Sequence, residues 1–326
     1  MKTPLFSCGF GSGGSDLTKN ILNAHPDIYI ASEINRLIYI SKRGYDCNTV
    51  FSELAEVDKF QRFLRDLHGG HVFESIDYDF SNEMEQKGIL GIEYVVQRCL
   101  SNREKDVSVW GAKTDPEQIV LLSKLFPRAK FLLVTRDVRD VCLSWRNKWG
   151  KDMVWCAAKW ADRMAQGLKF ASAMGTAGCL VVTFEDLISE TEKSCHNICN
   201  FIGVPFSDRM LNYHVYTDRW EKKLNYGRPI ISTNKEKWRK KLTKKMIIRI
   251  EEIAYSTMKL SGYQPEFANE LKPISRYEKV RGVCLDSWAI LFVGNRAYKK
   301  NCFRLRIRNA FRMLRKVCIR HTQLPR

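Results

Sequence analysis

The stretch that most constrains the fold covers residues 130–145 and reads KFLLVTRDVRDVCLSW. Its first half predicts a buried strand, and its second half predicts a helix that follows the strand directly. Arg136 ends the strand, and Ser144 comes eight residues later. Ligands of open α/β sheets bind outside the carboxyl ends of the strands, where a guanidinium and a hydroxyl suit a phosphate. We therefore expect an anion site here. The alternative is a helix start held by salt bridges within Arg-Asp-x-Arg-Asp.

Other segments repeat this alternation of strand and helix. Apolar runs predict further strands at Leu5–Phe10, Ile28–Ala31, Val109–Lys113 and Leu180–Phe184. Helical patterns are expected up to Ala24 and at Asp58–Leu67, Tyr94–Leu100, Pro116–Phe126, Glu192–Phe201 and Lys244–Leu260. The alternation predicts an α/β fold with a parallel sheet flanked by helices. Composition shifts after Pro273, so we expect an α/β domain over residues 1–272 and a basic helical extension over 273–326.

The chain is strongly basic, with a net charge of +18 over 326 residues. Residues 276–326 contain 14 Lys or Arg against two Asp or Glu, so most of this charge lies in the tail. A basic chain favours an anionic partner. The 11 cysteines show no metal-ligand spacing, so we expect no metal site and reduced thiols. No signal-peptide h-region and no run of 18 apolar residues occurs, which predicts a cytoplasmic protein.

A glycine-rich loop follows the first expected strand and consists of Gly11, Ser12, Gly13, Gly14, Ser15 and Asp16. Small residues let backbone amides approach an anion, and the following helix adds positive potential. Gly9, Gly11 and Gly14 also match the dinucleotide fingerprint, so a dinucleotide-binding α/β protein is one alternative. A tight turn without a ligand is the other. The Walker pattern is absent because no Gly-Lys-Ser/Thr occurs in the loop.

Taken together, five segments resemble the PAPS-dependent sulfotransferase family, whose sulfuryl donor is 3′-phosphoadenosine 5′-phosphosulfate. They occur in the family's order over roughly residues 4–265. The segments are the glycine loop with its helix up to Ile28, Ser32-Glu33, Lys113-Thr114-Asp-Pro116, Arg136 with Ser144, and Phe184-Glu-Asp-Leu leading to Gly203-Val-Pro205. Lys237-Trp238-Arg-Lys is similar to the family's late basic segment. The resemblance implies a P-loop-like fold, sulfuryl transfer from PAPS to a hydroxyl, and PAP as product.

The resemblance also implies roles for individual residues. Glu33 would be the base that deprotonates the acceptor, and Lys113 would stabilise the transferring group. The glycine loop would hold the 5′-phosphosulfate, while Arg136 and Ser144 would hold the 3′-phosphate. Lys237 or Arg139 would assist at the 3′-phosphate. For the neighbouring Asp137 and Asp140 we expect only the orientation of arginines or the capping of a helix.

The glycine loop departs from the family pattern at two positions. Ser12 stands where the family usually carries Arg or Lys, and Asp16 replaces a Thr or Ser. A carboxylate beside a phosphate adds repulsion. Lys19 lies one helical turn beyond Ser15 and would compensate, although a solvated lysine is the more usual outcome. The departure raises an alternative function, a catalytically impaired binding protein that keeps the donor fold.

The acceptor is the least constrained part of the prediction. Apolar residues at 3,4 spacing between Phe303 and Cys318, interleaved with arginines, predict a basic amphipathic helix. Such a helix either lies on an anionic membrane as a peripheral anchor or packs on the body. A nucleic-acid partner is disfavoured because no reader motif occurs. A membrane contact of the tail, together with the acceptors that the resemblance implies, favours a carbohydrate or glycolipid hydroxyl as the acceptor. The tryptophans between Trp145 and Trp160 pack in the core or line the acceptor pocket.

Overall fold

A computed structural model describes residues 2–32, 38–68, 78–100, 106–216 and 229–289. By their contacts these residues form two compact units, and each is described by itself. The first unit contains residues 1–10, 14–135 and 166–231. Of the described residues, the second contains 11–13, 136–165 and 232–289. Glu33 and the expected amphipathic helix at 303–318 lie outside the described residues.

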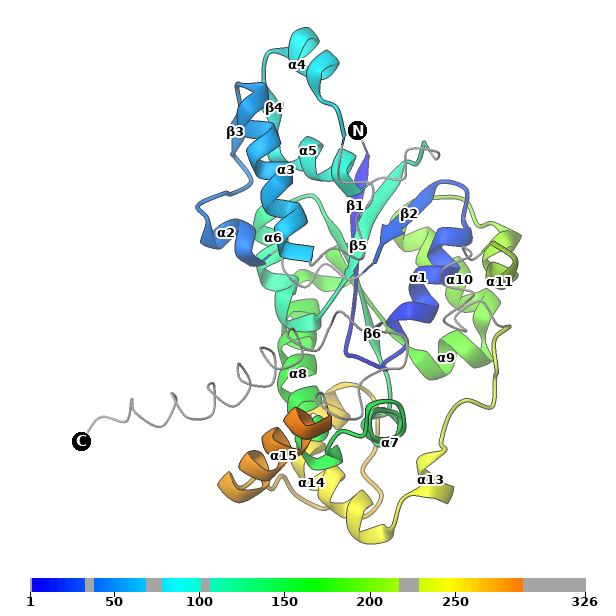
Figure 1. Ribbon diagram of the computed structural model, residues 1–326. Helices are drawn as coiled ribbons and strands as arrows, with labels where there is room; N and C mark the ends of the chain where they lie inside the picture. Colours follow the sequence, from blue (N-terminus) through cyan, green and yellow to red (C-terminus); the bar gives the residue numbers. More distant parts are fainter. Residues whose placement is uncertain (1, 33–37, 69–77, 101–105, 217–228, 290–326) are drawn as a thin grey trace, which may run out of the picture. The chain divides into compact units, whose positions relative to one another are not determined.

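The first unit is built on a parallel sheet of five strands in the order β2-β5-β1-β6-β7 (Figure 1). The strands are β1 (Thr3–Gly9), β2 (Ile28–Ala31), β5 (Val109–Thr114), β6 (Lys130–Thr135) and β7 (Cys179–Thr183). This arrangement confirms the predicted α/β fold with a parallel sheet. Each expected strand lies within two residues of an observed one.

Side chains of β1 alternate between the two faces of the sheet, as a strand requires. Leu5 packs with Leu132 and Val134 in a core shared with α1 (Ser15–Ala24) and α10 (Thr191–Ile202). Phe6, the next residue, instead joins an aromatic cluster with ring centroids 5.3–6.5 Å from those of Trp110, Phe126 and Phe131. Both faces of β1 are therefore buried, as expected for the central strand of a parallel sheet.

The first unit has further elements besides this sheet. They are α2 (Ile38–Lys42), β3 (Val50–Phe51), α3 (Leu54–His68), α4 (Ser81–Lys87), β4 (Leu90–Gly91), α5 (Ile92–Leu100), η1 (Pro116–Gln118), α6 (Ile119–Leu125), α9 (Phe184–Ser189), η2 (Asp208–Met210) and α11 (Tyr213–Tyr216). Of these, β3 and β4 form a separate antiparallel pair. In the loop after α1, the backbone N–H of Asp27 donates to His25 Nδ1. The His25 Nε2–H therefore donates to the Pro205 carbonyl at 2.7 Å, which gives His25 a structural role.

The second unit is helical. Its elements are α7 (Val138–Trp149), the first half of α8 (Met153–Gly178), α13 (Trp238–Lys241), α14 (Lys244–Leu260) and α15 (Arg276–Trp288). Trp160 and Trp238 are fully buried in it, and Trp145 is almost so. Core packing is therefore the role of these three tryptophans.

The α15 helix begins at a capping box. The Ser275 side chain accepts the backbone N–H of Glu278, and the Glu278 carboxylate accepts the backbone N–H of Ser275. This start lies close to the expected boundary at residue 273, but the division into residues 1–272 and 273–326 remains a prediction.

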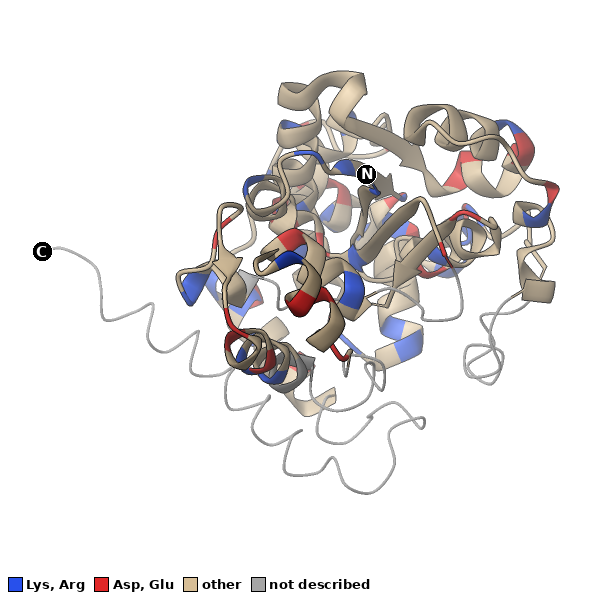
Figure 2. Cartoon of the chain, turned by 90° about the horizontal axis from the view of Figure 1, so that it is seen from above, with Lys and Arg blue, Asp and Glu red and all other residues tan. Residues whose placement is uncertain are grey.

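Charged side chains are spread over the helices of the described chain (Figure 2). None of the described helices is both long enough and apolar enough to cross a membrane. The cytoplasmic location and the membrane contact of the tail therefore remain predictions.

Candidate functional site

The glycine loop joins β1 to α1, as the sequence predicts, but two conformations in it are unusual. Ser12 has a φ of 65° and Gly14 a φ of 104°, both in the left-handed region. Gly14 is the N-cap of α1. A Cβ at Gly14 would lie 2.5 Å from Cδ2 of Phe184, so glycine is required there by conformation and by space. The loop thus makes a tight left-handed turn, packed against Phe184, where a strand leads into a helix N-terminus, the kind of place where anions bind.

The Ser12 end of this loop belongs to the second unit, together with Gly11 and Gly13. The Ser12 carbonyl accepts a hydrogen bond of 3.1 Å from Nη1 of Arg136. The Gly11 carbonyl accepts one of 2.8 Å from the indole of Trp145. The Ser12 hydroxyl is buried and has no hydrogen-bond partner among the described residues. The loop is therefore held through the carbonyl groups of Gly11 and Ser12.

Lys113 lies near the end of β5 and forms an ion pair with Asp16 in the first turn of α1. Its Nζ is 2.5 Å from Oδ1 of Asp16. The Lys113 side chain is 13% exposed and the Asp16 side chain 40%. The residue expected to stabilise the sulfuryl group is thus in contact with the residue that departs from the family pattern. No pattern in the sequence indicates this contact.

Lys19 is not the solvated lysine that the sequence suggested. It is only 5% exposed, and its ammonium donates to the Ser32 hydroxyl at 3.2 Å. A buried lysine on α1 therefore reaches the residue that precedes Glu33. Glu33 itself, the expected base, lies outside the described residues.

Three residues expected at the 3′-phosphate line one pocket of about 330 Å³ in the second unit: Arg136, Ser144 and Lys237. The same pocket is lined by Asp140, Leu143, Asn147, Lys148 and Asn234. Arg136 is 7% exposed, and its Nη2 donates to the Asn234 carbonyl at 3.0 Å. This carbonyl orients the guanidinium together with that of Ser12. A buried, oriented guanidinium beside a hydroxyl and two lysines fits a phosphate.

Asp140 is the acidic member of this pocket. Burial raises the pKa of its carboxyl, while the Arg136 charge and the backbone N–H of Trp238 act to lower it. That N–H lies 3.0 Å from Oδ1 of Asp140. Asp140 therefore ties α7 to α13 and faces Arg136. This structural role agrees with the one expected from the sequence.

Arg139 does not assist at the pocket, in contrast to one of the expectations above. It is 4% exposed, its Nε and Nη2 donate to Asp137, and its Nη1 donates to Glu251 at 2.6 Å. Its guanidinium carbon also lies 3.8 Å from the ring centroid of Trp238. Asp137 in turn caps α7 by accepting the backbone N–H of Arg139. Arg139 is therefore a structural clamp, and of these two cations it is Lys237 that lines the pocket.

Two lining residues were missed although a sequence signal existed. Asn147 and Lys148 lie three and four residues after Ser144, which places them on one face of α7 with it. Asn234 contributes through its backbone, and no residue pattern announces such a contact.

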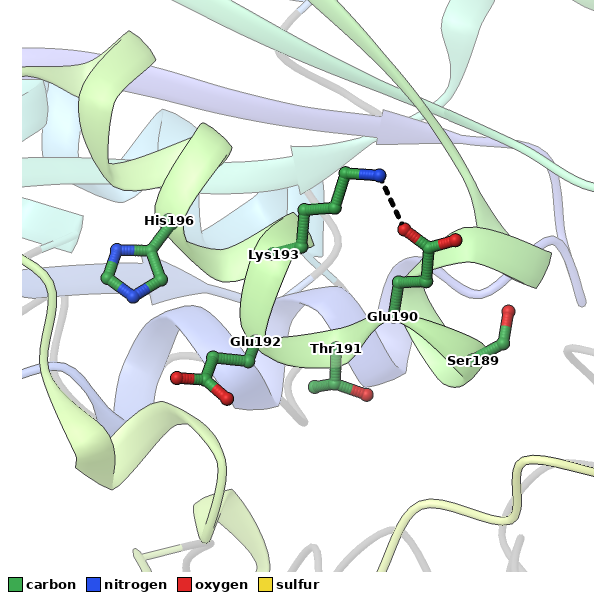
Figure 3. A pocket seen from close by; sticks show the side chains of 6 residues that line it. All are labelled: Ser189, Glu190, Thr191, Glu192, Lys193 and His196. Atoms are coloured by element: carbon green, nitrogen blue, oxygen red, sulfur yellow. Dashed lines mark hydrogen bonds and ion pairs between the residues drawn. The ribbon is translucent and has the colours of Figure 1, made fainter.

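Another hollow, this one in the first unit, lies along α9 and α10 (Figure 3). It is lined by residues 189–193 and His196, none of which the sequence predicted to act. Lys193 forms an ion pair of 2.7 Å with Glu190 there. No group of three or more His, Cys, Asp or Glu in the described ranges is arranged to hold a metal ion.

Comparison with known proteins gives the same family as the motifs. The model of the sulfotransferase family matches residues 4–208, which is more than half of the chain. The chain belongs to the sulfotransferase family. Its fold is similar to that of the sulfotransferase domain from the Synechococcus PCC 7002 olefin synthase. The TM-score is 0.54 at 21% identity, over 80% of this chain and 95% of that one.

Two curated relatives are similar to this sulfotransferase over part of their length. Protein-tyrosine sulfotransferase 2 of Gallus gallus is 34% identical over 101 residues, which are 29% of this chain and 27% of the relative. Protein-tyrosine sulfotransferase A of Caenorhabditis elegans is 25% identical over 149 residues, or 40% and 39% of the two chains. The matches therefore span less than half of either relative.

Proposed function

We propose that this protein transfers a sulfuryl group from PAPS to a hydroxyl acceptor. The observation that carries the proposal is the pocket lined by Arg136, Ser144 and Lys237. The family resemblance assigned these residues to the 3′-phosphate from two separate segments, and they come together around one hollow. The left-handed turn of the glycine loop at the N-terminus of α1 supports binding of the 5′ end.

The proposed chemistry is an in-line displacement at sulfur. The acceptor oxygen forms a bond to sulfur, the bond from sulfur to the 5′-phosphate oxygen breaks, and PAP leaves. Glu33 takes the acceptor proton, as the family resemblance implies. The Lys113 ammonium neutralises charge on the transferring group and on the leaving phosphate. The catalysis we assign to the chain is thus mainly positioning and charge stabilisation.

For the acceptor we propose a tyrosine hydroxyl of a protein, because both curated relatives are named for this activity. The net charge of +18 favours a tyrosine with acidic neighbours. The glycan or glycolipid hydroxyl favoured by the sequence alone has no support in the described residues, and it becomes the second class to test.

Calorimetric titration of PAP tests the donor site. We expect Arg136→Ala to weaken binding by about 10- to 100-fold, because a charged hydrogen bond is worth about 1.5–3 kcal/mol. Ser144→Ala should weaken it by about fivefold. Arg62→Ala, which removes an exposed arginine of α3, is the charge-matched control and should bind as the wild type does. Equal binding by wild type and Arg136→Ala would refute the assignment of this pocket.

Release of PAP from PAPS, measured with tyrosine-containing acidic peptides and with a panel of glycans, tests the acceptor. We expect turnover with the peptides and its loss in Lys113→Ala. Turnover with glycans alone would reverse the choice of acceptor. Tight PAP binding without turnover for any acceptor would favour the catalytically impaired binding protein. Stabilisation by NAD but not by PAP would favour the alternative that the chain is a dinucleotide-binding protein and uses Gly9, Gly11 and Gly14.

A further inference from the structure

The ion pair between Asp16 and Lys113 has a consequence for donor binding. Lys113 Nζ lies 2.5 Å from Asp16 Oδ1, within hydrogen-bonding distance as well as ionic contact. Both residues belong to the first unit, one near the carboxyl end of β5 and the other in the first turn of α1. Asp16 thus places a carboxylate in the first turn of α1, directly after the glycine loop, where it contacts Lys113.

We propose that Asp16 is an internal competitor of the donor: it holds Lys113 in the donor-free protein, and PAPS must displace it to reach the lysine. The inference rests on the proposed donor site. It assigns to Asp16 control over donor affinity, which is distinct from the roles of base and charge stabiliser.

Electrostatics argues against simultaneous binding of both anions. An ammonium has three N–H donors, so geometry alone would allow two partners. Two anions held by one ammonium lie only about 5 Å apart, however, and they repel each other. The helix N-terminus that attracts the donor phosphate also attracts Asp16. The carboxylate therefore competes with the donor for the lysine and for the helix start.

Exposure indicates which partner of the pair gives way. The Lys113 side chain is 13% exposed, whereas that of Asp16 is 40% exposed. A carboxylate with access to water loses little solvation when it turns outward. Lys113 has no comparable route to solvent. Displacement of Asp16, with Lys113 retained in place, is the exchange that costs less free energy.

Calorimetric titration of PAP into Asp16→Asn tests the inference. Asparagine keeps the shape and removes the charge, so we expect about five- to tenfold tighter binding than in the wild type. Glu192→Gln is the matched control because it makes the same charge change on an exposed residue of α10 in the same unit. It should leave the affinity unchanged. The melting temperature of each variant shows whether it is folded.

A second measurement separates competition from simple repulsion. If Asp16 competes with PAP for the Lys113 ammonium, the lysine contributes less to PAP binding when Asp16 is present. Lys113→Met should therefore weaken PAP binding less in the wild type than in the Asp16→Asn background. Equal losses in both backgrounds would mean that the pair is not exchanged, and the inference would be wrong.

The two proposals fail in different ways. Binding by the wild type with no gain in Asp16→Asn overturns the competition and leaves the donor site standing. No PAP binding by the wild type or by Asp16→Asn overturns the donor site and the competition together. Binding by Asp16→Asn where the wild type shows none would be the strongest support for Asp16 as competitor.

Discussion

The indole of Trp145 donates a hydrogen bond of 2.8 Å to the carbonyl of Gly11, and this bond ties α7 to the glycine loop. A Cβ at Gly11 would lie 3.4 Å from the same ring, so the ring lies against the Cα of Gly11 and also binds its carbonyl. The ammonium groups of Lys151 and Lys159 lie 4.6 and 4.5 Å from the centroid of the ring. Burial lowers the pKa of Lys151, and the charge of Lys159 lowers it further. The ring is thus fixed by cations and in turn fixes the loop.

Replacing Trp145 by Phe should weaken PAP binding about three- to tenfold. The ring remains, but the loss of the indole N–H removes the bond that orients the Gly11 carbonyl, at a cost of about 1 kcal/mol. Trp149→Phe on the same helix is the control, because its ring lies 5.4 Å from that of Trp145 and the Gly11 bond is kept. Titration of PAP into both variants checks this. Identical affinities would show that the loop does not need Trp145.

Replacing Glu251 by Ala should destabilise the second unit by about 3–5 kcal/mol, since it leaves the buried Arg139 charge with one partner fewer. Glu251 has no exposed surface, and it accepts the backbone N–H groups of residues 266–268 as well as the bond from Arg139. Glu270→Ala removes a carboxylate that is 71% exposed and should cost at most about 1 kcal/mol. Urea unfolding of both variants measures the difference. Similar midpoints would contradict the clamp.

Gly14→Ala should destabilise the first unit by about 2–3 kcal/mol and weaken PAP binding. The alanine would have to adopt a positive φ, and its Cβ would lie 2.5 Å from Cδ2 of Phe184. Gly44→Ala has a comparable φ of 86° but meets nothing within 4 Å, so it isolates the conformational cost of about 1 kcal/mol. Thermal unfolding compares the two. Adding Phe184→Leu should recover part of the excess loss of Gly14→Ala, and the absence of any excess would refute the close approach.

The Glu278 carboxylate should make the free energy of unfolding decrease as the pH falls below about 4.5. Hydrogen bonds from Arg249 lower the pKa of Glu278 to about 2, from an ordinary value of 4.5, and Ser275 lowers it as well. Because the folded pKa is the lower one, this contribution is fully present above pH 4.5 and is lost as the pH falls towards 2. Glu278→Gln should cost about 0.5–2 kcal/mol at pH 7. Urea unfolding at several pH values, with Glu270→Gln as control, should show this difference shrinking between pH 5 and pH 2. A difference that is constant with pH would exclude the shift.

The sheet could be predicted from sequence because both of its faces are buried. Apolar runs such as the one before Arg136 mark such strands, and short connections leave few topologies to consider. The long helix α8 carries no comparable signal, since it combines buried and exposed residues over 26 positions and contains a non-helical Gly175. No helix was predicted over this range.

The site could be predicted in part. Arg136, Ser144 and Lys237 come together as their motifs indicate, because each motif is a side chain at a fixed place relative to a strand or helix. The contact between Asp16 and Lys113 joins residues 97 positions apart and leaves no pattern in the chain. The burial of Lys19 and the clamp role of Arg139 likewise depend on tertiary neighbours. Charge type can be read from the sequence, whereas the partner of a charge cannot.

The Arg139 clamp also limits where this chain can be shortened. The family match ends at residue 208, but the contacts of Arg139 extend further along the chain. Its guanidinium binds the Glu251 carboxylate, which also accepts the backbone N–H groups of residues 266–268. A fragment cut at the end of the match would keep the residues of α7 that line the pocket and lose the carboxylate that neutralises Arg139. We therefore expect a stable form of this unit to need the chain up to residue 268, well beyond the segment by which the family is recognised.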